Sequence, residues 1–308
     1  MNILIIGYGS IGKRHFAILN KFDEVKEINI VTKQELKDIV TFTELNEITN
    51  LVFYDYFIIS SETVKHYEQL KYICSKVNNK KILVEKPLYD KTHDAINSNN
   101  EIFTAYNLRF HPVMQKLSNI LKDEEIYYAN IICGQYLPTW RPAKNYKLSY
   151  SASLKQGGGV LRDLSHELDY TAWLFGDIVK INAINTKISD LEITSDDLFT
   201  AIAFTKKRAV VNITMDYISK TPIRRLIIHT ADKTIEADLI NNTIVMYDKN
   251  ANREEVSLGK IESNHSYSKM HEAILGNNYE KLCSFTHGKK IVKLINNIEF
   301  KELTNEKI

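Results

Sequence analysis

A glycine pattern near the start of the chain constrains the fold more than any other feature. Gly7-x-Gly9-x-x-Gly12 follows the apolar run Ile3 to Ile6 directly, and a helical pattern continues to about residue 22. Between a strand and a helix, the first glycine allows a tight turn, the second lets the backbone approach a pyrophosphate, and the third lets helix and strand pack closely. The N–H groups at the helix start then bind the anion. We therefore expect a dinucleotide site, rather than an ordinary strand-to-helix turn, made by Gly7, Gly9, Ser10, Ile11 and Gly12.

The residues after the second expected strand, Ile28 to Val31, bear on which nicotinamide cofactor fits. A carboxylate about 20 residues beyond the loop would hold the ribose hydroxyls of NAD. This strand is instead followed by Thr32 and Lys33, and Glu35 comes slightly late. A hydroxyl and an ammonium there would accommodate a 2′-phosphate, so we favour NADP over NAD and expect Thr32 and Lys33 to contact it.

The first 110 residues alternate between apolar runs typical of strands and helical patterns. Such alternation predicts right-handed crossovers and a doubly wound parallel sheet, which is an α/β fold. We therefore assign residues 1–110 to a dinucleotide-binding Rossmann domain. The expected elements are strands at Ile3–Ile6, Ile28–Val31, Tyr56–Ile59, Ile82–Val84 and Ile102–Ala105, and a helix at Thr63–Lys76.

Residues 111–308 have a different pattern and are assigned to a second domain, for substrate binding and oligomerisation. A helix is expected at Pro112–Leu121, and a β-rich stretch at Glu125–Leu137. Alternating apolar runs separated by short polar turns then predict an open, mainly antiparallel sheet, and thus an α+β domain. These runs are Ile181–Ile188, Leu198–Phe204, Ala209–Met215, Leu226–His229, Thr234–Leu239 and Thr243–Tyr247, with a last helix at about Tyr267–Leu275.

Composition excludes several classes of partner. The 308 residues carry a formal net charge of +2, which gives no reason to expect nucleic acid or an anionic membrane surface. The apolar stretches are too short to span a bilayer, and the N-terminus lacks the basic start of a signal peptide. The three cysteines, Cys74, Cys133 and Cys283, form no CxxC pair and are expected to be reduced. We expect a cytoplasmic protein.

A lysine follows the apolar run Ile82 to Val84, in the sequence Glu85-Lys86-Pro87. Ligands of open α/β sheets bind beyond the carboxyl ends of the strands, so a side chain at this position points toward the cofactor crevice. Pro87 keeps Lys86 out of helical geometry and fixes its direction. We expect Glu85 and Lys86 to line the cofactor site, although a surface lysine before a turn proline would have the same local sequence.

The chain resembles the glucose-fructose oxidoreductase, inositol dehydrogenase and rhizopine-catabolism (Gfo/Idh/MocA) family over most of its length. The matching motifs are Gly7 to Gly12, then Glu85-Lys86-Pro87, then Gly157-Gly158-Gly159 leading to Asp163, His166 and Asp169, with Asn107 to Pro112 similar to the segment that links the domains. The resemblance implies an open antiparallel second domain, and a lysine near nicotinamide and substrate in a Lys–Pro bond that is often cis. It also implies an NAD(P)-dependent sugar oxidoreductase.

The segment after the three glycines has a helical apolar pattern that continues to about Gly176. Asp163 and His166 are three residues apart, which places them on one helix face. Histidine exchanges protons near neutral pH, and a carboxylate orients it, so the pair suits the proton transfer that accompanies alcohol oxidation. The alternatives are a surface helix without chemistry, or a metal site that includes Asp169. We expect no metal.

Catalytic roles are carried over from the family to Lys86, His166 and Asp163. Relatives usually have aspartate four residues before the histidine, where this chain has Arg162, and Asp163 lies one step closer. His166 therefore matches more closely than Asp163. Asp169, three residues after His166, matches the second acidic position of the family, and we count it with the substrate-binding residues.

The loop from Pro138 to Ser153 is rich in aromatic and hydrogen-bonding side chains, which suits a sugar. Arg141 and Lys147 are candidates for binding a phosphate or carboxylate on the substrate, and Arg162 is a third. The loop also resembles relatives whose genes lie beside those for surface-sugar synthesis. A purely structural loop remains the alternative.

These observations predict an enzyme that transfers hydride between nicotinamide and a sugar, sugar phosphate or nucleotide sugar. The alternatives are a non-enzymatic nicotinamide-binding regulator and a structural subunit with the same fold. The open sheet is expected to bury its face in a homo-oligomer, either a dimer or a tetramer.

Overall fold

The computed structural model describes residues 1–142 and 145–298, which form two compact units. The first unit contains Met1–Phe110 and Ser263–Leu294, and the second begins at His111. The sequence prediction assigned everything after residue 110 to the second domain, but the structure groups Ser263–Leu294 with the first unit. Helix α6 (His265–Leu275) packs there against α1 (Ser10–Leu19) and the turn Asn107–Phe110.

The first unit has the expected parallel sheet, with the strand order β15-β6-β5-β4-β1-β2-β3. All pairs are parallel except β15 with β6. The strands are β1 (Asn2–Ile6), β2 (Glu27–Val31), β3 (Thr41–Phe42), β4 (Tyr56–Ile59), β5 (Lys81–Val84), β6 (Glu101–Thr104) and β15 (Cys283–Ser284). The helices besides α1 and α6 are α2 (His66–Lys76) and α7 (Phe285–Asn296), whose last two residues belong to the second unit.

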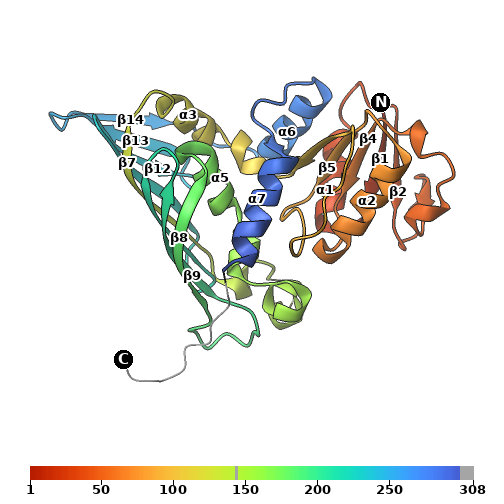
Figure 1. Cartoon of the computed structure of the whole chain (residues 1–308), viewed down its shortest axis with the longest axis horizontal. Helices are drawn as coiled ribbons and strands as arrows, with labels where there is room; N and C mark the ends of the chain where they lie inside the picture. Colours follow the sequence, from red (N-terminus) through yellow and green to blue (C-terminus); the bar gives the residue numbers. More distant parts are fainter. Residues whose placement is uncertain (143–144, 299–308) are drawn as a thin grey trace. The chain divides into compact units, whose positions relative to one another are not determined.

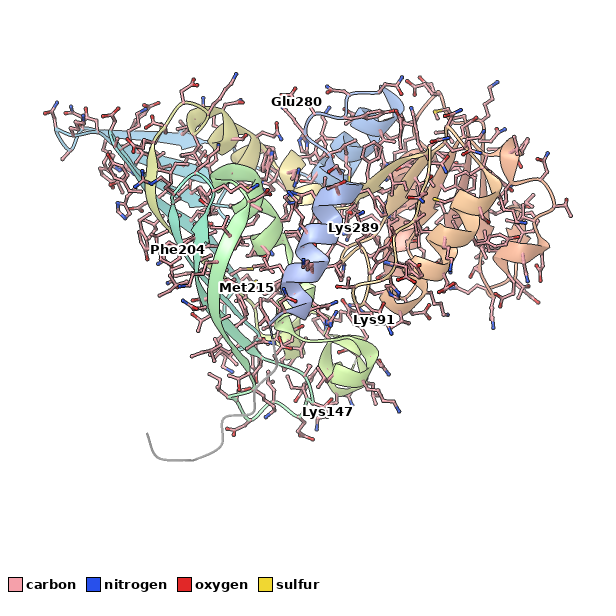
Figure 2. The ribbon with its side chains drawn as sticks, in the orientation of Figure 1. Lys91, Lys147, Phe204, Met215, Glu280 and Lys289 are labelled. Carbon is pink, nitrogen blue, oxygen red and sulfur yellow. The ribbon has the colours of Figure 1, made fainter. Side chains whose placement is uncertain are left out.

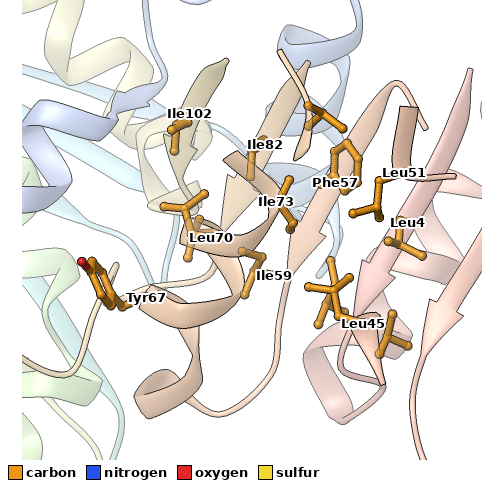
Figure 3. Packing of buried hydrophobic residues seen from close by; sticks show 14 of the residues in the cluster. Leu4, Leu45, Leu51, Phe57, Ile59, Tyr67, Leu70, Ile73, Ile82 and Ile102 are labelled. Atoms are coloured by element: carbon orange, nitrogen blue, oxygen red, sulfur yellow. The ribbon is translucent and has the colours of Figure 1, made fainter. Parts of the chain in front are cut away.

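The strands of this sheet are buried on both faces, which explains their continuous apolar sequences. Leu4 and Ile59 pack on the side covered by α2, together with Leu70 and Ile73 of that helix (Figure 3). Alternate residues, such as Ile3, belong to the core on the opposite side. Parallel pairing brings the carboxyl ends of β1, β4 and β5 to one edge, where the candidate cofactor residues begin.

The second unit is built on an eight-stranded sheet with the order β14-β13-β12-β11-β7-β10-β9-β8. Its pairs are antiparallel except β7 with β10, which run parallel. The strands are β7 (Ile126–Gly134), β8 (Ile178–Thr186), β9 (Leu198–Thr205), β10 (Val210–Asp216), β11 (Ile223–Thr230), β12 (Thr234–Asp238), β13 (Thr243–Tyr247) and β14 (Arg253–Ser257). The expected mainly antiparallel sheet is therefore confirmed.

In the part of the chain that the structure describes, helices cover one face of this second sheet and leave the other uncovered. Helices α3 (Pro112–Ile120) and α5 (His166–Phe175) pack against its strands from the same side (Figure 1). Met215 lies fully buried on the covered face, whereas Phe204 is 40% exposed on the other (Figure 2). Along β9 and β10, buried and partly exposed residues alternate as the pleat requires.

The elements differ from the prediction in two ways. The helix expected after the three glycines is two helices, α4 (Val160–Asp163) and α5, because the backbone leaves helical geometry at Leu164. Strands β3, β14 and β15 and helix α7 were not predicted. Among the described residues, no helix is long and apolar enough to cross a membrane.

Candidate functional site

The loop between β1 and α1 has the geometry that a pyrophosphate site requires. Gly7 has φ +94°, and a Cβ there would lie 2.6 Å from the backbone nitrogen of Ser61. A Cβ on Gly12 would lie 2.1 Å from the carbonyl oxygen of Gly7. No described atom lies within 4 Å of a Cβ built on Gly9. The first and third glycines are therefore needed by the turn itself, while the second leaves the backbone open to a ligand.

The N-terminus of α1 is available for an anion. Gly9 is the N-cap, no described side chain caps the helix, and its first turn holds no acidic residue. The predicted phosphate-binding residues, from Ser10 to Gly12, form this first turn. The orphan N–H groups and the positive end of the helix dipole favour a phosphate at this position.

The end of β2 offers a hydroxyl and an ammonium. Thr32 donates its backbone N–H to Phe42, and its hydroxyl accepts the N–H of Gln34. The amide nitrogen of the Gln34 side chain donates to the carbonyl of Tyr8, which joins this turn to the glycine loop. Lys33 is exposed, with its Nζ 3.6 Å from Glu44. Residues 32 to 34 therefore place hydrogen-bonding side chains beside the glycine loop, and none of these three side chains is a carboxylate.

Lys86 follows β5 at the same edge of the sheet. Val84 is in register with Ile59 of β4, which is in register with Ile6 of β1. Gly7 and Glu85, the residues that follow Ile6 and Val84, therefore leave the sheet at the same level, two strands apart. Adjacent strands are about 4.8 Å apart, which puts these two backbone positions roughly 10 Å from each other. The Lys86–Pro87 peptide bond is cis.

Glu85 is buried next to this edge of the sheet, and each of its two carboxylate oxygens makes a hydrogen bond. Its Oε2 accepts the backbone N–H of Lys86 at 3.1 Å, and its Oε1 lies 2.9 Å from Nε2 of His15. His15 and Glu85 form a hydrogen-bonded pair away from solvent. On the other side, His15 contacts His271 of α6. Sequence analysis missed both histidines, although His15 stands only three residues after Gly12.

Asp163 and His166 lie on two successive helices. Asp163 ends α4, and His166 begins α5 with Ser165 at its N-cap. The two residues do not share one helix face in the way the sequence predicted. Gly159, with φ +117°, precedes α4, and a Cβ there would lie 2.0 Å from Oδ1 of Asp196.

Two tyrosine hydroxyls bind the carboxylate of Asp163. Tyr150 donates to Oδ1 at 2.7 Å and Tyr217 donates to Oδ2 at 2.6 Å. The negative charge of Asp163, followed by burial, raises the pKa of Tyr150, and burial followed by Asp163 raises that of Tyr217. Both tyrosines therefore stay protonated and keep donating. Neither partner was identified from sequence, because Tyr217 is 54 residues away.

An ion pair between a buried glutamate and a partly exposed arginine holds α5 against the sheet. Glu167 is fully buried and accepts from Nε of Arg224 at 2.8 Å, and Tyr170 donates to the same carboxylate. Asp169, a predicted substrate-binding residue, is also buried in α5. Arg162, the other candidate on this segment, is partly exposed in α4. The glutamate and arginine fix the helix that begins with His166.

The aromatic loop encloses a cavity of about 420 Å³ within the second unit. It is lined by Leu137, Trp140, Arg141, Asn145, Tyr146, Leu148, Ser149, Tyr150 and Ser151. The buried indole nitrogen of Trp140 has no hydrogen-bond partner among the described residues. Arg141, a predicted anion ligand, lines the cavity. Lys147, a second predicted ligand, does not line it. Its ammonium instead pairs with Glu192, which raises the pKa of Lys147.

The predicted site residues are divided between the two units. The glycine loop, Thr32, Lys33 and Lys86 meet at one edge of the first sheet. His166 and the remaining candidates belong to the second unit. That Lys86 and His166 act on one substrate remains a prediction.

Comparison with known proteins finds matches to both units. Residues 1–112 match an oxidoreductase family with an NAD-binding Rossmann fold, and residues 116–236 match the GFO/IDH/MocA C-terminal domain. An oxidoreductase of Synechocystis sp. is 28% identical over 126 residues, which span 38% of this chain but only 33% of that relative.

Solved structures of similar fold include two sugar dehydrogenases. UDP-N-acetylglucosamine 3-dehydrogenase from Acidithiobacillus ferrooxidans has a TM-score of 0.79 at 19% identity, covering 97% of this chain and 96% of that one. Levoglucosan dehydrogenase in complex with NADH has a TM-score of 0.80 at 17% identity, covering 96% and 95%. At these identities the likeness establishes the fold.

Proposed function

Because the chain belongs to the GFO/IDH/MocA oxidoreductase family, we propose that it transfers hydride between a nicotinamide cofactor and a carbon of a sugar, sugar phosphate or nucleotide sugar. One observation carries the proposal. The open glycine loop and Lys86 start from the same row of the first sheet, two strands apart. A dinucleotide whose pyrophosphate lies on α1 then extends along the edge where Lys86 stands.

The cofactor, when bound, supplies the carbon that accepts or donates the hydride. In this proposal Lys86 donates a hydrogen bond to the substrate oxygen, and His166 takes the hydroxyl proton as the carbonyl forms. Asp163, with Tyr150 and Tyr217, supports the helix start that carries His166. General acid–base catalysis of this kind contributes about 10²–10⁴-fold to a rate.

We propose NADP as the preferred cofactor, with NAD as the alternative. Support comes from Thr32 and Lys33 at the end of β2, where a carboxylate for the ribose hydroxyls of NAD would otherwise stand. The related levoglucosan dehydrogenase binds NADH, so the choice has to be tested on this chain.

The cavity of the aromatic loop supports a sugar as substrate. Aromatic rings such as Trp140 and Tyr146 cover the apolar faces of a sugar ring, while Asn145 and Ser149 bind hydroxyls. Arg141 suits a phosphate attached to the sugar. Two dehydrogenases of similar fold act on UDP-N-acetylglucosamine and levoglucosan, which are both carbohydrates.

The uncovered face of the second sheet supports a homo-oligomer, either a dimer or a tetramer. Ile184 of β8 pairs with Thr200 of β9, and Ile202 and Phe204 follow at alternate positions of β9; the three apolar residues are each at least two-fifths exposed. An apolar patch of this kind is commonly buried against a second copy. We also propose a cytoplasmic location, which the three free cysteines support.

The decisive experiment follows nicotinamide fluorescence while the purified protein is incubated with a panel of sugars, sugar phosphates and nucleotide sugars. Turnover should depend on Lys86 and His166, and Lys86→Ala should abolish it without preventing cofactor binding. Lys91→Ala is the matched control, because Lys91 is an exposed lysine five residues away (Figure 2). Tight cofactor binding without turnover of any substrate would favour a regulator, and turnover only with a co-purified partner would favour a subunit.

A further inference from the structure

A buried chain of four polar side chains runs from Tyr56 to the residue before Lys86. The hydroxyl of Tyr56 lies 3.0 Å from Nδ1 of His271, and Nε2 of His271 lies 2.8 Å from Nδ1 of His15. Nε2 of His15 lies 2.9 Å from Oε1 of Glu85. Tyr56, His15 and His271 are completely buried, and Glu85 is 7% exposed. All four belong to the first unit.

The contacts form a continuous series of donors and acceptors. A Glu85 carboxylate that accepts both of its contacts requires His15 to donate from Nε2. If Nδ1 of His15 accepts the Nε2–H of His271, then Nδ1 of His271 is the acceptor for the hydroxyl proton of Tyr56. Burial, followed by the neighbouring His15, lowers the pKa of His271 far below its usual value, and burial raises the pKa of Tyr56. Both of these groups therefore stay neutral.

The chain is suited to hold a group in place rather than to conduct a proton. Conduction would require Tyr56 to pass its proton to another acceptor. Within residues 1–142 and 145–298, the Tyr56 hydroxyl has no hydrogen bond other than the one to His271. Its raised pKa also opposes ionisation. The chain therefore ends at Tyr56.

At its other end, this series of hydrogen bonds reaches the backbone of Lys86 through Glu85. Glu85 accepts from His15 with one oxygen and from the backbone N–H of Lys86 with the other. His15 lies in α1, the helix that begins at the glycine loop, and Tyr56 begins β4, the strand between β1 and β5. The chain therefore ties the helix of the pyrophosphate site to the backbone that carries Lys86. A fully satisfied buried network of this kind specifies one arrangement of its surroundings.

We propose that Tyr56, His271 and His15 are positioning residues for the reaction, which fix the Glu85 carboxylate and through it the backbone of Lys86. The inference rests on the proposed function, in which the Lys86 ammonium binds the substrate oxygen. Displacing a reacting group by about 1 Å costs on the order of 100-fold in rate. His271 thus influences chemistry at a lysine 185 positions earlier in the chain.

The test compares Tyr56→Phe with Tyr54→Phe. Both tyrosines are buried in the first unit, and both hydroxyls are hydrogen-bonded. The hydroxyl of Tyr54, however, accepts from Asn29 and takes no part in the hydrogen bonds that link Tyr56 to Glu85. In the full-length protein with cofactor and substrate, Tyr56→Phe should lower kcat by roughly 10-fold and leave the KM for cofactor within about twofold. Tyr54→Phe should leave kcat unchanged. Equal kcat values for the two variants would overturn the inference.

Histidine ¹⁵N NMR supplies a readout that stability alone does not change. In the wild type, Nδ1 of His271 should show the chemical shift of a ring nitrogen that accepts a hydrogen bond. In Tyr56→Phe, that shift should change because the hydroxyl donor is gone, while Nε2 of His271 keeps its contact with His15. An unchanged Nδ1 shift of His271 in Tyr56→Phe would overturn the inference.

A second pair of variants tests the chemistry of position 271. His271→Gln keeps a donor and an acceptor, so it should retain more activity than the apolar His271→Leu. Equal losses in both would contradict a positioning role. Failure of the wild type to turn over any sugar would overturn the proposed function and this inference together, whereas turnover that Tyr56→Phe leaves intact would overturn the inference alone.

Discussion

Tyr217 donates a hydrogen bond of 2.6 Å to Oδ2 of Asp163, from a position 54 residues later in the chain. Tyr150 donates to the other oxygen, so this carboxylate joins the aromatic loop, α4 and the end of β10. Asp163 is 6% exposed, and its two partners remain protonated because their pKa values are raised. The aspartate is therefore a structural anchor of the segment that leads to His166.

Replacing this anchor should destabilise the second unit. Asp163→Asn turns one acceptor into a donor that faces a tyrosine hydroxyl, and it should lower the free energy of unfolding by about 1–3 kcal/mol. Urea denaturation measures the change. Asp190→Asn, at an exposed aspartate, should have no effect. Equal stabilities for the two variants would show that the tyrosine contacts contribute nothing.

Two glycine substitutions should separate folding from cofactor binding. Gly9→Ala adds a methyl group into open space, so the protein should fold normally but bind cofactor at least about 10-fold more weakly, because the methyl group occupies the pyrophosphate position. Gly12→Ala drives a methyl group against the carbonyl of Gly7 and should cost about 1–3 kcal/mol of stability. Fluorescence titration and thermal melting measure the two effects. A Gly9→Ala variant with wild-type affinity would place the cofactor elsewhere.

The cofactor preference should depend on Lys33. Removing its ammonium in Lys33→Ala should raise the KM for NADP about 10-fold and leave the KM for NAD unchanged, because only NADP carries a 2′-phosphate. Lys37→Ala, at another exposed lysine of the same connection, serves as control. If Lys33→Ala affects both cofactors equally, the 2′-phosphate assignment is wrong.

Asp196 should make stability depend on pH. Burial raises the pKa of this carboxyl to about 6, despite the backbone N–H of Leu161 that it accepts. The folded protein therefore holds this proton more tightly than the unfolded chain, so ionising Asp196 favours unfolding. Between about pH 4 and pH 6 its contribution should reduce stability by about 2–3 kcal/mol as the pH rises.

The variant Asp196→Asn isolates that contribution. It cannot titrate, so its free energy of unfolding should fall less than that of the wild type between pH 4 and pH 7. Denaturant titrations at the two pH values give the difference. Parallel pH profiles for wild type and variant would mean that Asp196 ionises normally in the folded protein.

The uncovered face of the second sheet should control oligomeric state. Phe204→Glu places a charge on this face, between strands β8 and β10, and should shift the protein toward monomer in analytical ultracentrifugation. Ile240→Glu is the control, because Ile240 is 51% exposed, against 40% for Phe204, but lies in the turn after β12. An unchanged assembly in Phe204→Glu would move the interface to another surface.

Local patterns predicted most of the fold because its elements carry strong, short-range signals. The buried strands of the first unit are continuous apolar runs, and the second sheet alternates as a half-covered sheet must. Helix α7 escaped detection because Gly288 interrupts its pattern. That glycine has a tertiary cause, since a Cβ there would lie 2.2 Å from Oγ1 of Thr104 in β6.

The candidate site was predictable only where its residues are close in sequence. The glycine loop and Lys86 follow strands directly, so their place at a sheet edge could be inferred. The partners of Glu85 could not be, because they form a chain with His271, which lies in a helix 256 residues after His15. The break between α4 and α5 likewise accompanies contacts of Asp163 with distant tyrosines, which no local pattern encodes.

Deuterium transfer tests the central claim most directly. NADPH or NADH labelled at C4, on either face of the ring, is incubated with the protein and keto-sugar substrates, and the products are analysed by mass spectrometry. The account predicts that one of the two labelled forms delivers its deuterium to a sugar carbon in the wild type, and that Lys86→Ala reduces this transfer at least about 100-fold. Cofactor binding without deuterium in any sugar, or equal transfer by Lys86→Ala, would contradict it.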